Sequence, residues 1–60
     1  MTLSKALELT GIRENELSRI SVSALDRVIK LTVEDAKTFD PYGHKAEQIE
    51  AYKFIREVIA

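Results

Sequence analysis

The sequence predicts a small all-α domain built from three main helices over a chain of 60 residues. Hydrophobic residues recur every three or four positions, which places them on one face of a helix. The two glycines and the single proline stand between these periodic stretches, where helices are expected to end. We therefore expect a single helical domain over residues 1–60, with a short N-terminal helix followed by an antiparallel helical hairpin of about 24–39 and 44–58.

The composition excludes several classes of protein. Hydrophobic residues make up 45% of the chain and charged residues 32%, which is typical of a folded soluble protein. The chain has no cysteine, which excludes disulfides, zinc–thiolate sites and thiol nucleophiles. It has no apolar run long enough for a membrane span and no signal-peptide pattern at its start, so we expect a cytoplasmic protein. The net charge of −1 gives the whole molecule no attraction to nucleic acid or anionic lipid.

The first helix is expected over about 3–9, with a clear ending. The candidates for its N-cap are Thr2 and Ser4. Gly11 is expected to adopt the left-handed conformation that ends many helices, and Ile12 then follows in the position that contacts Leu7. These positions together predict a Schellman ending.

A less regular segment follows over residues 13–21. Either Arg13 or Asn15 is expected to open a single helical turn, after which Leu17 and Ile20 share a face. Serines compete for backbone hydrogen bonds and favour helix caps, so the next helix should begin beside them. Ser23, with Asp26 three residues later, resembles a capping box and predicts a helix that starts at about residue 24.

The helix expected over about 24–39 has a clear apolar stripe and one exception to it. At 100° per residue, the stripe comprises Val22, Leu25, Val28, Ile29, Thr32, Val33, Ala36 and Phe39. Leu31 lies about 120° from the centre of this stripe, between Arg27 and Asp35, where solvent is expected. Leu31 is therefore a candidate surface residue.

A short link and the last helix complete the chain. Asp40–Gly43 suits a type I turn, or a cap in which Pro41 takes the first helical position. The stripe of the helix expected over 44–58 comprises His44, Gln48, Ala51, Tyr52, Ile55, Val58 and Ile59. Ile49 and Phe54 lie at opposite shoulders of it, so this helix is more apolar than one partner helix requires. The expected core includes Leu7, Ile12, Leu17, Ile20, Leu25, Ile29, Ala36, Phe39, Tyr52, Ile55 and Val58.

No catalytic, metal-binding or cofactor-binding motif is evident in the sequence. His44 is the single histidine, and a nearby Asp40 does not provide the three or four ligands that zinc prefers. The carboxylates are spaced as solvated helix faces, and the two isolated glycines do not form a phosphate-binding loop. We expect a protein that is not an enzyme, with no cofactor, no bound metal and no small-molecule substrate.

The function that the sequence favours is protein–protein interaction. A chain of about 60 residues buries only about 60% of its unfolded surface, so association is a natural source of additional stability. The hydrophobic residues left over after the stripes are assigned are Leu31, Ile49, Phe54 and Tyr42, which are the predicted partner-binding residues. They predict a small accessory or regulatory protein that docks on a larger protein or forms a homodimer. Chains of this size are common in phage and mobile-element genomes.

An alternative is a small DNA- or RNA-binding regulator. Arg27, Lys30 and Lys37 lie on one face of the second main helix, as they would in a recognition helix. Asp26 and Glu34 share that stripe and would repel phosphates. This alternative therefore ranks second to protein–protein interaction.

Overall fold

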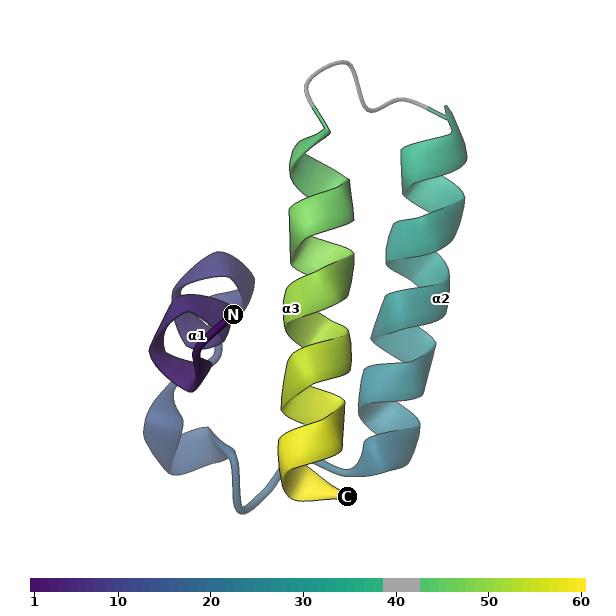
Figure 1. The fold of residues 1–60 in the computed structure, drawn as a ribbon. Helices are drawn as coiled ribbons and strands as arrows, with labels where there is room; N and C mark the ends of the chain where they lie inside the picture. The colour runs from purple at the N-terminus through teal and green to yellow at the C-terminus, as the bar shows by residue number, and fades with distance from the viewer. Residues whose placement is uncertain (39–42) are drawn as a thin grey trace.

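The computed structural model describes residues 1–38 and 43–60 of the chain. Its helices are α1 (Leu3–Thr10), α2 (Val22–Thr38) and α3 (His44–Ile59), with a 3-10 turn, η1 (Glu14–Glu16), between α1 and α2 (Figure 1). The predicted all-α class with three main helices is confirmed. Phe39 and the predicted turn residues Asp40, Pro41 and Tyr42 lie outside the described residues.

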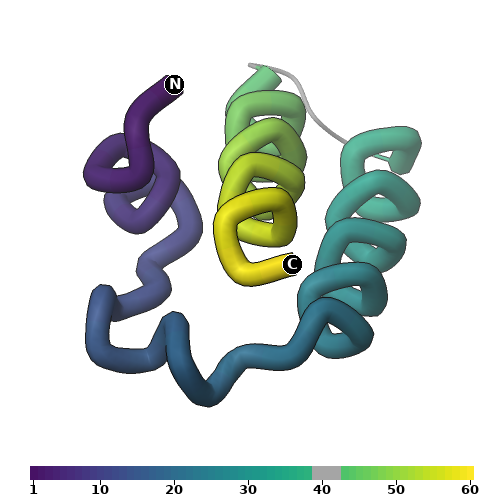
Figure 2. The backbone as a smooth tube through the Cα atoms, turned by 60° about the horizontal axis from the view of Figure 1, so that its bottom comes forward, coloured from purple at the N-terminus to yellow at the C-terminus, as the bar shows by residue number. Residues whose placement is uncertain are grey.

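Helix α3 lies between the other two helices. It packs against α2 and also against α1, and both views place α1 and α2 on opposite sides of it (Figures 1 and 2). Helices α2 and α3 run antiparallel, as predicted, whereas α1 crosses α3 steeply (Figure 1). This arrangement explains why α3 carries more apolar surface than one partner requires: it has two partners.

The buried core is small and is shared by all three helices. Among the described residues, the fully covered side chains are Ala6 from α1, Leu25 from α2, and Ala51 and Ile55 from α3. Around them pack half-buried hydrophobic residues: Leu3, Leu7, Leu9, Ile12, Leu17, Ile20, Tyr52, Phe54 and Ile59. Two of the four buried side chains are alanines, and small side chains allow helices to approach closely.

The predicted core is confirmed in its centre and corrected at its margin. Leu25 and Ile55 are buried, whereas the other predicted core residues that the structure describes are half-buried, apart from Val58. The prediction for Val58 is wrong, since its side chain is 49% exposed. The eight residues of α1 cross α3 near Ala51 and Ile55, and their cover does not extend one turn further to Val58. His44, placed in the same stripe, is also exposed.

Helix α1 begins as predicted and ends in a related but different way. The Thr2 hydroxyl accepts a hydrogen bond from the Lys5 N–H at 3.2 Å, so Thr2 is the N-cap. Gly11 has φ +74°, and its N–H donates to the Leu7 carbonyl at 2.9 Å. The Ile12 N–H donates to the Thr10 hydroxyl at 3.4 Å rather than to Leu7. The ending is therefore the simpler left-handed motif and not the predicted Schellman motif.

Helix α2 begins earlier than the sequence predicts. The Ser21 hydroxyl accepts a hydrogen bond from the Ala24 N–H at 3.1 Å, so the N-cap is Ser21 and the predicted cap at Ser23 is wrong. Both serines suit a cap chemically, and the choice depends on where the chain leaves the preceding turn. That turn, η1, is the single helical turn predicted for this segment, and Leu17 and Ile20 pack against the core after it.

Helix α3 begins directly after Gly43, which has φ +70°. This left-handed conformation is one that glycine adopts without the steric cost that a side chain would bring. The helix runs to Ile59, one residue beyond the predicted end. Its position between α1 and α2 leaves a third side facing solvent, and the candidate site lies there.

Candidate partner-binding surface

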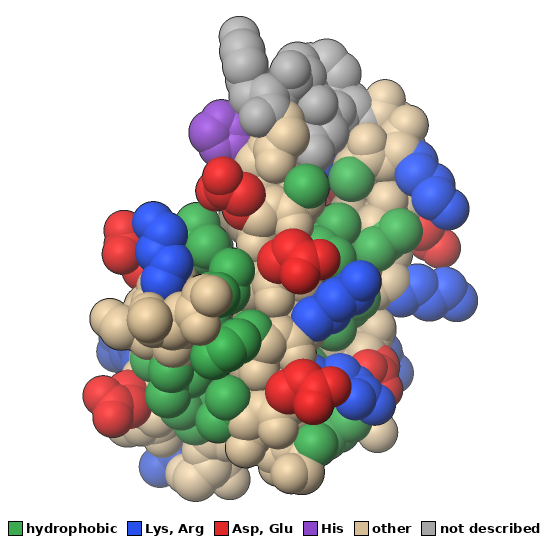
Figure 3. Space-filling model, in the orientation of Figure 1, with side chains coloured by type: hydrophobic (Ala, Val, Ile, Leu, Met, Phe, Trp, Pro, Cys, Tyr) green, Lys and Arg blue, Asp and Glu red, His purple; other side chains and the backbone are tan. Residues whose placement is uncertain are grey.

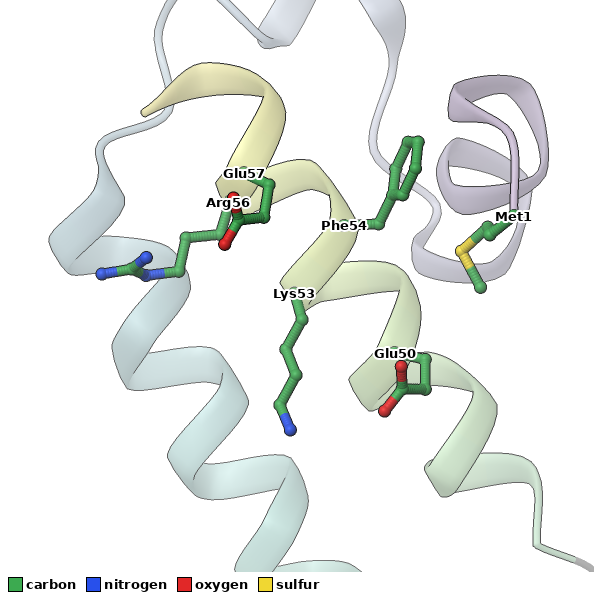
Figure 4. A pocket seen from close by; sticks show the side chains of 6 residues that line it. All are labelled: Met1, Glu50, Lys53, Phe54, Arg56 and Glu57. Carbon is green, nitrogen blue, oxygen red and sulfur yellow. The ribbon is translucent and has the colours of Figure 1, made fainter.

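Two adjoining depressions lie along the solvent-facing side of α3. The first, of about 460 Å³, is lined by Met1, Lys5, Leu9, Ala46, Glu47 and Glu50. The second, of about 480 Å³, is lined by Met1, Glu50, Lys53, Phe54, Arg56 and Glu57 (Figure 4). Met1 and Glu50 line both of them, so the two depressions form one surface, the α1–α3 depression.

The local sequence explains how the two sides of the depression arise. Residues 46, 50, 53 and 57 follow one another by four, three and four positions, which places them along one face of α3. Thr2 has an extended backbone, with φ −105° and ψ 161°, and the chain before α1 brings Met1 beside α3 (Figure 4). Phe54 points from α3 toward α1 (Figure 4). Apolar groups from two distant parts of the chain therefore meet here.

Charged groups surround these apolar groups. Lys5 and Lys53 carry positive charge, and Glu47, Glu50 and Glu57 carry negative charge. Figure 3 shows basic side chains in blue and acidic side chains in red among the hydrophobic ones on the face that it presents. The surface thus combines apolar area from Met1, Leu9, Ala46 and Phe54 with a charged rim. This combination is the usual anatomy of a protein–protein interface.

Arg56 stands at the edge of the depression and is held toward α2. Its Nε donates to Asp26 Oδ1 at 2.6 Å, and the two side chains are 38% and 52% exposed. The hydrogen bond that Arg56 donates to Asp26, together with the negative charge of that carboxylate, raises the pKa of Arg56 above its usual value. Arg56 therefore remains charged and directed to α2, which leaves Lys53 as the basic group of this edge.

Of the four predicted partner-binding residues, the structure describes Leu31, Ile49 and Phe54, and it does not gather these three into one patch. Leu31 is 55% exposed on α2, and Ile49 is half-buried on α3. Ile49 is seven residues before Arg56 and so shares the α2-facing side of α3, whereas Phe54 lies about 140° further around the helix. Of these three described residues, only Phe54 lines the depression, and Tyr42 lies outside the described residues.

The predicted nucleic-acid-binding residues do share a face. Arg27, Lys30 and Lys37 are all exposed on α2, within an arc of about 80°. Glu34 falls inside the same arc and is also exposed. Asp26, at the edge of the arc, is engaged by Arg56.

Sequence reasoning missed Met1, Leu9 and Ala46 as surface candidates. Leu9 lies outside the stripe that Leu3 and Leu7 form, and this was the signal that could have indicated it. Met1 gave no signal, because its place beside α3 depends on how α1 packs.

Within residues 1–38 and 43–60, no three His, Asp or Glu side chains are grouped in a way that could hold a metal ion. None of the described helices combines the length and the apolar character that a membrane crossing requires. The chain matches no protein-family model, no curated protein and no solved structure.

Proposed function

We propose that this chain is a non-catalytic protein-interaction module that docks on a larger protein through the α1–α3 depression. The observation that carries this proposal is apolar surface that the small core leaves uncovered beside α3. Met1 is 56% exposed there, and Phe54 lies next to it, half-buried. The accessible surface of the chain, 4462 Å², is about a tenth larger than the roughly 4,000 Å² expected of a compact protein of 6.8 kDa.

The chemistry of the depression favours an amphipathic helix of the partner as its occupant. A helix laid into such a depression would place its apolar side chains on Met1, Leu9 and Phe54, and its charged side chains against the rim. Methionine suits this task because its unbranched thioether adapts to different apolar shapes. The rim carries both signs of charge, which favours one register of the partner over others.

Site-specific crosslinking in the native cells tests this proposal. A photoreactive p-benzoylphenylalanine replaces Lys53, an exposed residue that lines the depression. The matched control carries it at Arg13, which is exposed and lies before η1. We expect one larger protein to be crosslinked from position 53 and not from position 13.

A blocking variant completes the test. Ala46→Arg adds a long side chain inside the depression at an exposed helical position, so the fold should persist. We expect this variant to abolish the crosslink while circular dichroism remains unchanged. Equal crosslinking from both positions, or a crosslink that survives Ala46→Arg, would contradict docking at this surface.

A DNA- or RNA-binding function is the second candidate, favoured by the common exposed face of Arg27, Lys30 and Lys37. If these three side chains neutralise phosphates, the logarithm of the binding constant should fall against the logarithm of salt with a slope of about −2 to −3. Fluorescence anisotropy with mixed DNA and RNA oligonucleotides measures this slope. Undetectable binding at low salt, or binding without salt dependence, would remove this candidate.

A further inference from the structure

Helix α2 has an uncovered face on the side away from α3. The helix packs against α3, while α1 lies on the far side of α3 (Figures 1 and 2). Ala24, Val28 and Leu31 follow at spacings of four and three residues, so they form a narrow apolar strip along α2. Ala24 and Leu31 are exposed and Val28 is half-buried. Leu31 is the largest side chain of this strip.

The charges around Leu31 are arranged symmetrically along the helix. Arg27 lies four residues before Leu31, and Asp35 lies four residues after it; both are exposed. Neither has an oppositely charged residue three or four positions away in α2, unlike Asp26, Lys30, Glu34 and Lys37. Within the described part of the chain, neither Arg27 nor Asp35 takes part in an ion pair.

We infer that a second copy of this chain binds this face, with the two α2 helices antiparallel about a two-fold axis at Leu31. Such an axis places each residue before Leu31 opposite the residue equally far after Leu31 in the second copy. Leu31 then meets Leu31 of the second copy, and Arg27 faces Asp35 of the second copy, twice by symmetry. Arg27 and Asp35 each lie about 6 Å from Leu31 along the helix axis, in opposite directions. Arg27 of one copy is therefore level with Asp35 of the second copy, and its long side chain can reach that carboxylate.

The charge pattern selects this arrangement over the alternatives. A parallel pairing of the two α2 helices would place Arg27 against Arg27 and Asp35 against Asp35 of the second copy, which is repulsive. A helix face with one positive and one negative charge at equal distances from the same exposed leucine is complementary to a second copy of that face in the antiparallel arrangement. An unrelated partner would not require that symmetry. This face is separate from the α1–α3 depression, so the inference goes beyond the proposed function and does not depend on it.

The size of the contact sets the expected strength of the dimer. Helix α2 has 17 residues and is therefore about 25 Å long, and a single crossing of two such helices falls below the roughly 1,200 Å² of a stable interface. We expect a weak dimer that forms between micromolar and millimolar concentration. The contact is thus concentration-dependent, and its occupancy responds to the amount of protein present.

Sedimentation equilibrium over this concentration range tests the dimer. We expect the mass to rise from 6.8 kDa toward twice that value, and Leu31→Lys to keep the chain at 6.8 kDa with unchanged helicity, since Leu31 is exposed. Wild-type chain that stays at 6.8 kDa up to millimolar concentration would overturn the inference. Dimerisation of Leu31→Lys as strong as that of the wild type would overturn it too.

Charge reversal tests the antiparallel geometry. Arg27→Asp puts two negative charges opposite each other in both facing pairs of the contact, and Asp35→Arg puts two positive charges there, so each variant alone should remain monomeric. An equimolar mixture should form a heterodimer, because every facing pair then has opposite charges. Lys37→Asp is the matched control: it makes the same charge change about 120° around α2 from Leu31 and should dimerise like the wild type. A mixture that stays monomeric, or a control that dissociates, would overturn the geometry.

The dimerisation experiments on α2 can fail or succeed independently of the crosslinking experiment on the α1–α3 depression. Position 53 lies on α3, outside the α2 face, so crosslinking to a larger protein can succeed or fail whether or not the chain dimerises. A monomeric chain that still crosslinks would leave the proposed function in place. A dimer without a crosslink would leave the α2 contact in place.

Discussion

The guanidinium of Arg56 donates a hydrogen bond from Nε to Asp26 Oδ1 at 2.6 Å, which links two residues 30 positions apart in the sequence. Asp26 lies near the start of α2 and Arg56 near the end of α3, so the pair connects the two helices at the end of the hairpin away from residues 39–42 (Figure 1). Both side chains are partly exposed to water. The pair therefore orients the helix ends more than it stabilises the fold.

The first prediction follows from this exposure. Asp26→Asn should lower the melting temperature slightly in dilute buffer and not at all in molar salt, because salt screens charges that face water. The raised pKa of Arg56 means that its contribution is fully present below the ordinary arginine pKa and is lost only as pH rises through the raised value. The contribution of the Arg56 charge to the stability of the fold should therefore be constant across the neutral pH range. Thermal unfolding by circular dichroism measures both properties, with Glu34→Gln as the control. A large, salt-independent loss would show that the pair is more than a surface contact.

The second prediction separates two residues that the sequence treats alike. Ile55→Ala removes the largest fully buried side chain among the described residues and should cost about 2–5 kcal/mol of unfolding free energy. For a chain of this length, that is enough to unfold much of the population. Val58→Ala changes a half-exposed side chain and should cost about 0.5 kcal/mol or less. Urea titration followed by circular dichroism measures both. Equal losses for the two variants would contradict the exposed position of Val58.

The third prediction concerns the end of α1. Gly11 has φ +74°, and a Cβ at this position would meet no atom within 4 Å, so the cost of a substitution comes from the backbone alone. Gly11→Ala should therefore cost about 1 kcal/mol. Gly11→Asn should lose less, because asparagine tolerates the left-handed conformation better than alanine does. If alanine and asparagine proved equally costly in urea titrations, the left-handed backbone would not be the cause.

The fourth prediction tests the start of α2. Ser21→Ala removes the hydroxyl that accepts from the Ala24 N–H and should cost about 0.5–2 kcal/mol. Ser23→Ala lies inside the helix, where alanine is the better helix former, and should be neutral or slightly stabilising. The two variants have the same composition, so urea titration compares the two positions directly. If Ser23→Ala lost more unfolding free energy than Ser21→Ala, then Ser23 would be the N-cap, as the sequence pattern predicts.

Much of the candidate surface was beyond sequence reasoning, for identifiable reasons. Leu31 was predicted to be exposed because its angle on α2 excludes it from the apolar stripe, and angle alone decides that. The sequence groups Phe54 and Ile49 with Leu31, because these two residues make the apolar surface of the last helix wider than one partner helix can cover. In the structure α3 has two partner helices, so these residues pack on different sides. Met1 beside Phe54 depends on the path of the chain before α1.

The sequence by itself determined the elements of this protein: the periodic apolar residues, Thr2 and Gly11 define helices whose ends lie within two residues of those observed. These features depend on backbone geometry and neighbouring residues, which a linear pattern contains. Only the tertiary structure decided that Ser21 rather than Ser23 caps α2, that Val58 is exposed, and that α3 lies between α1 and α2. Each of these depends on where a short helix meets a distant one, because burial is a property of what covers a residue and not of the residue itself.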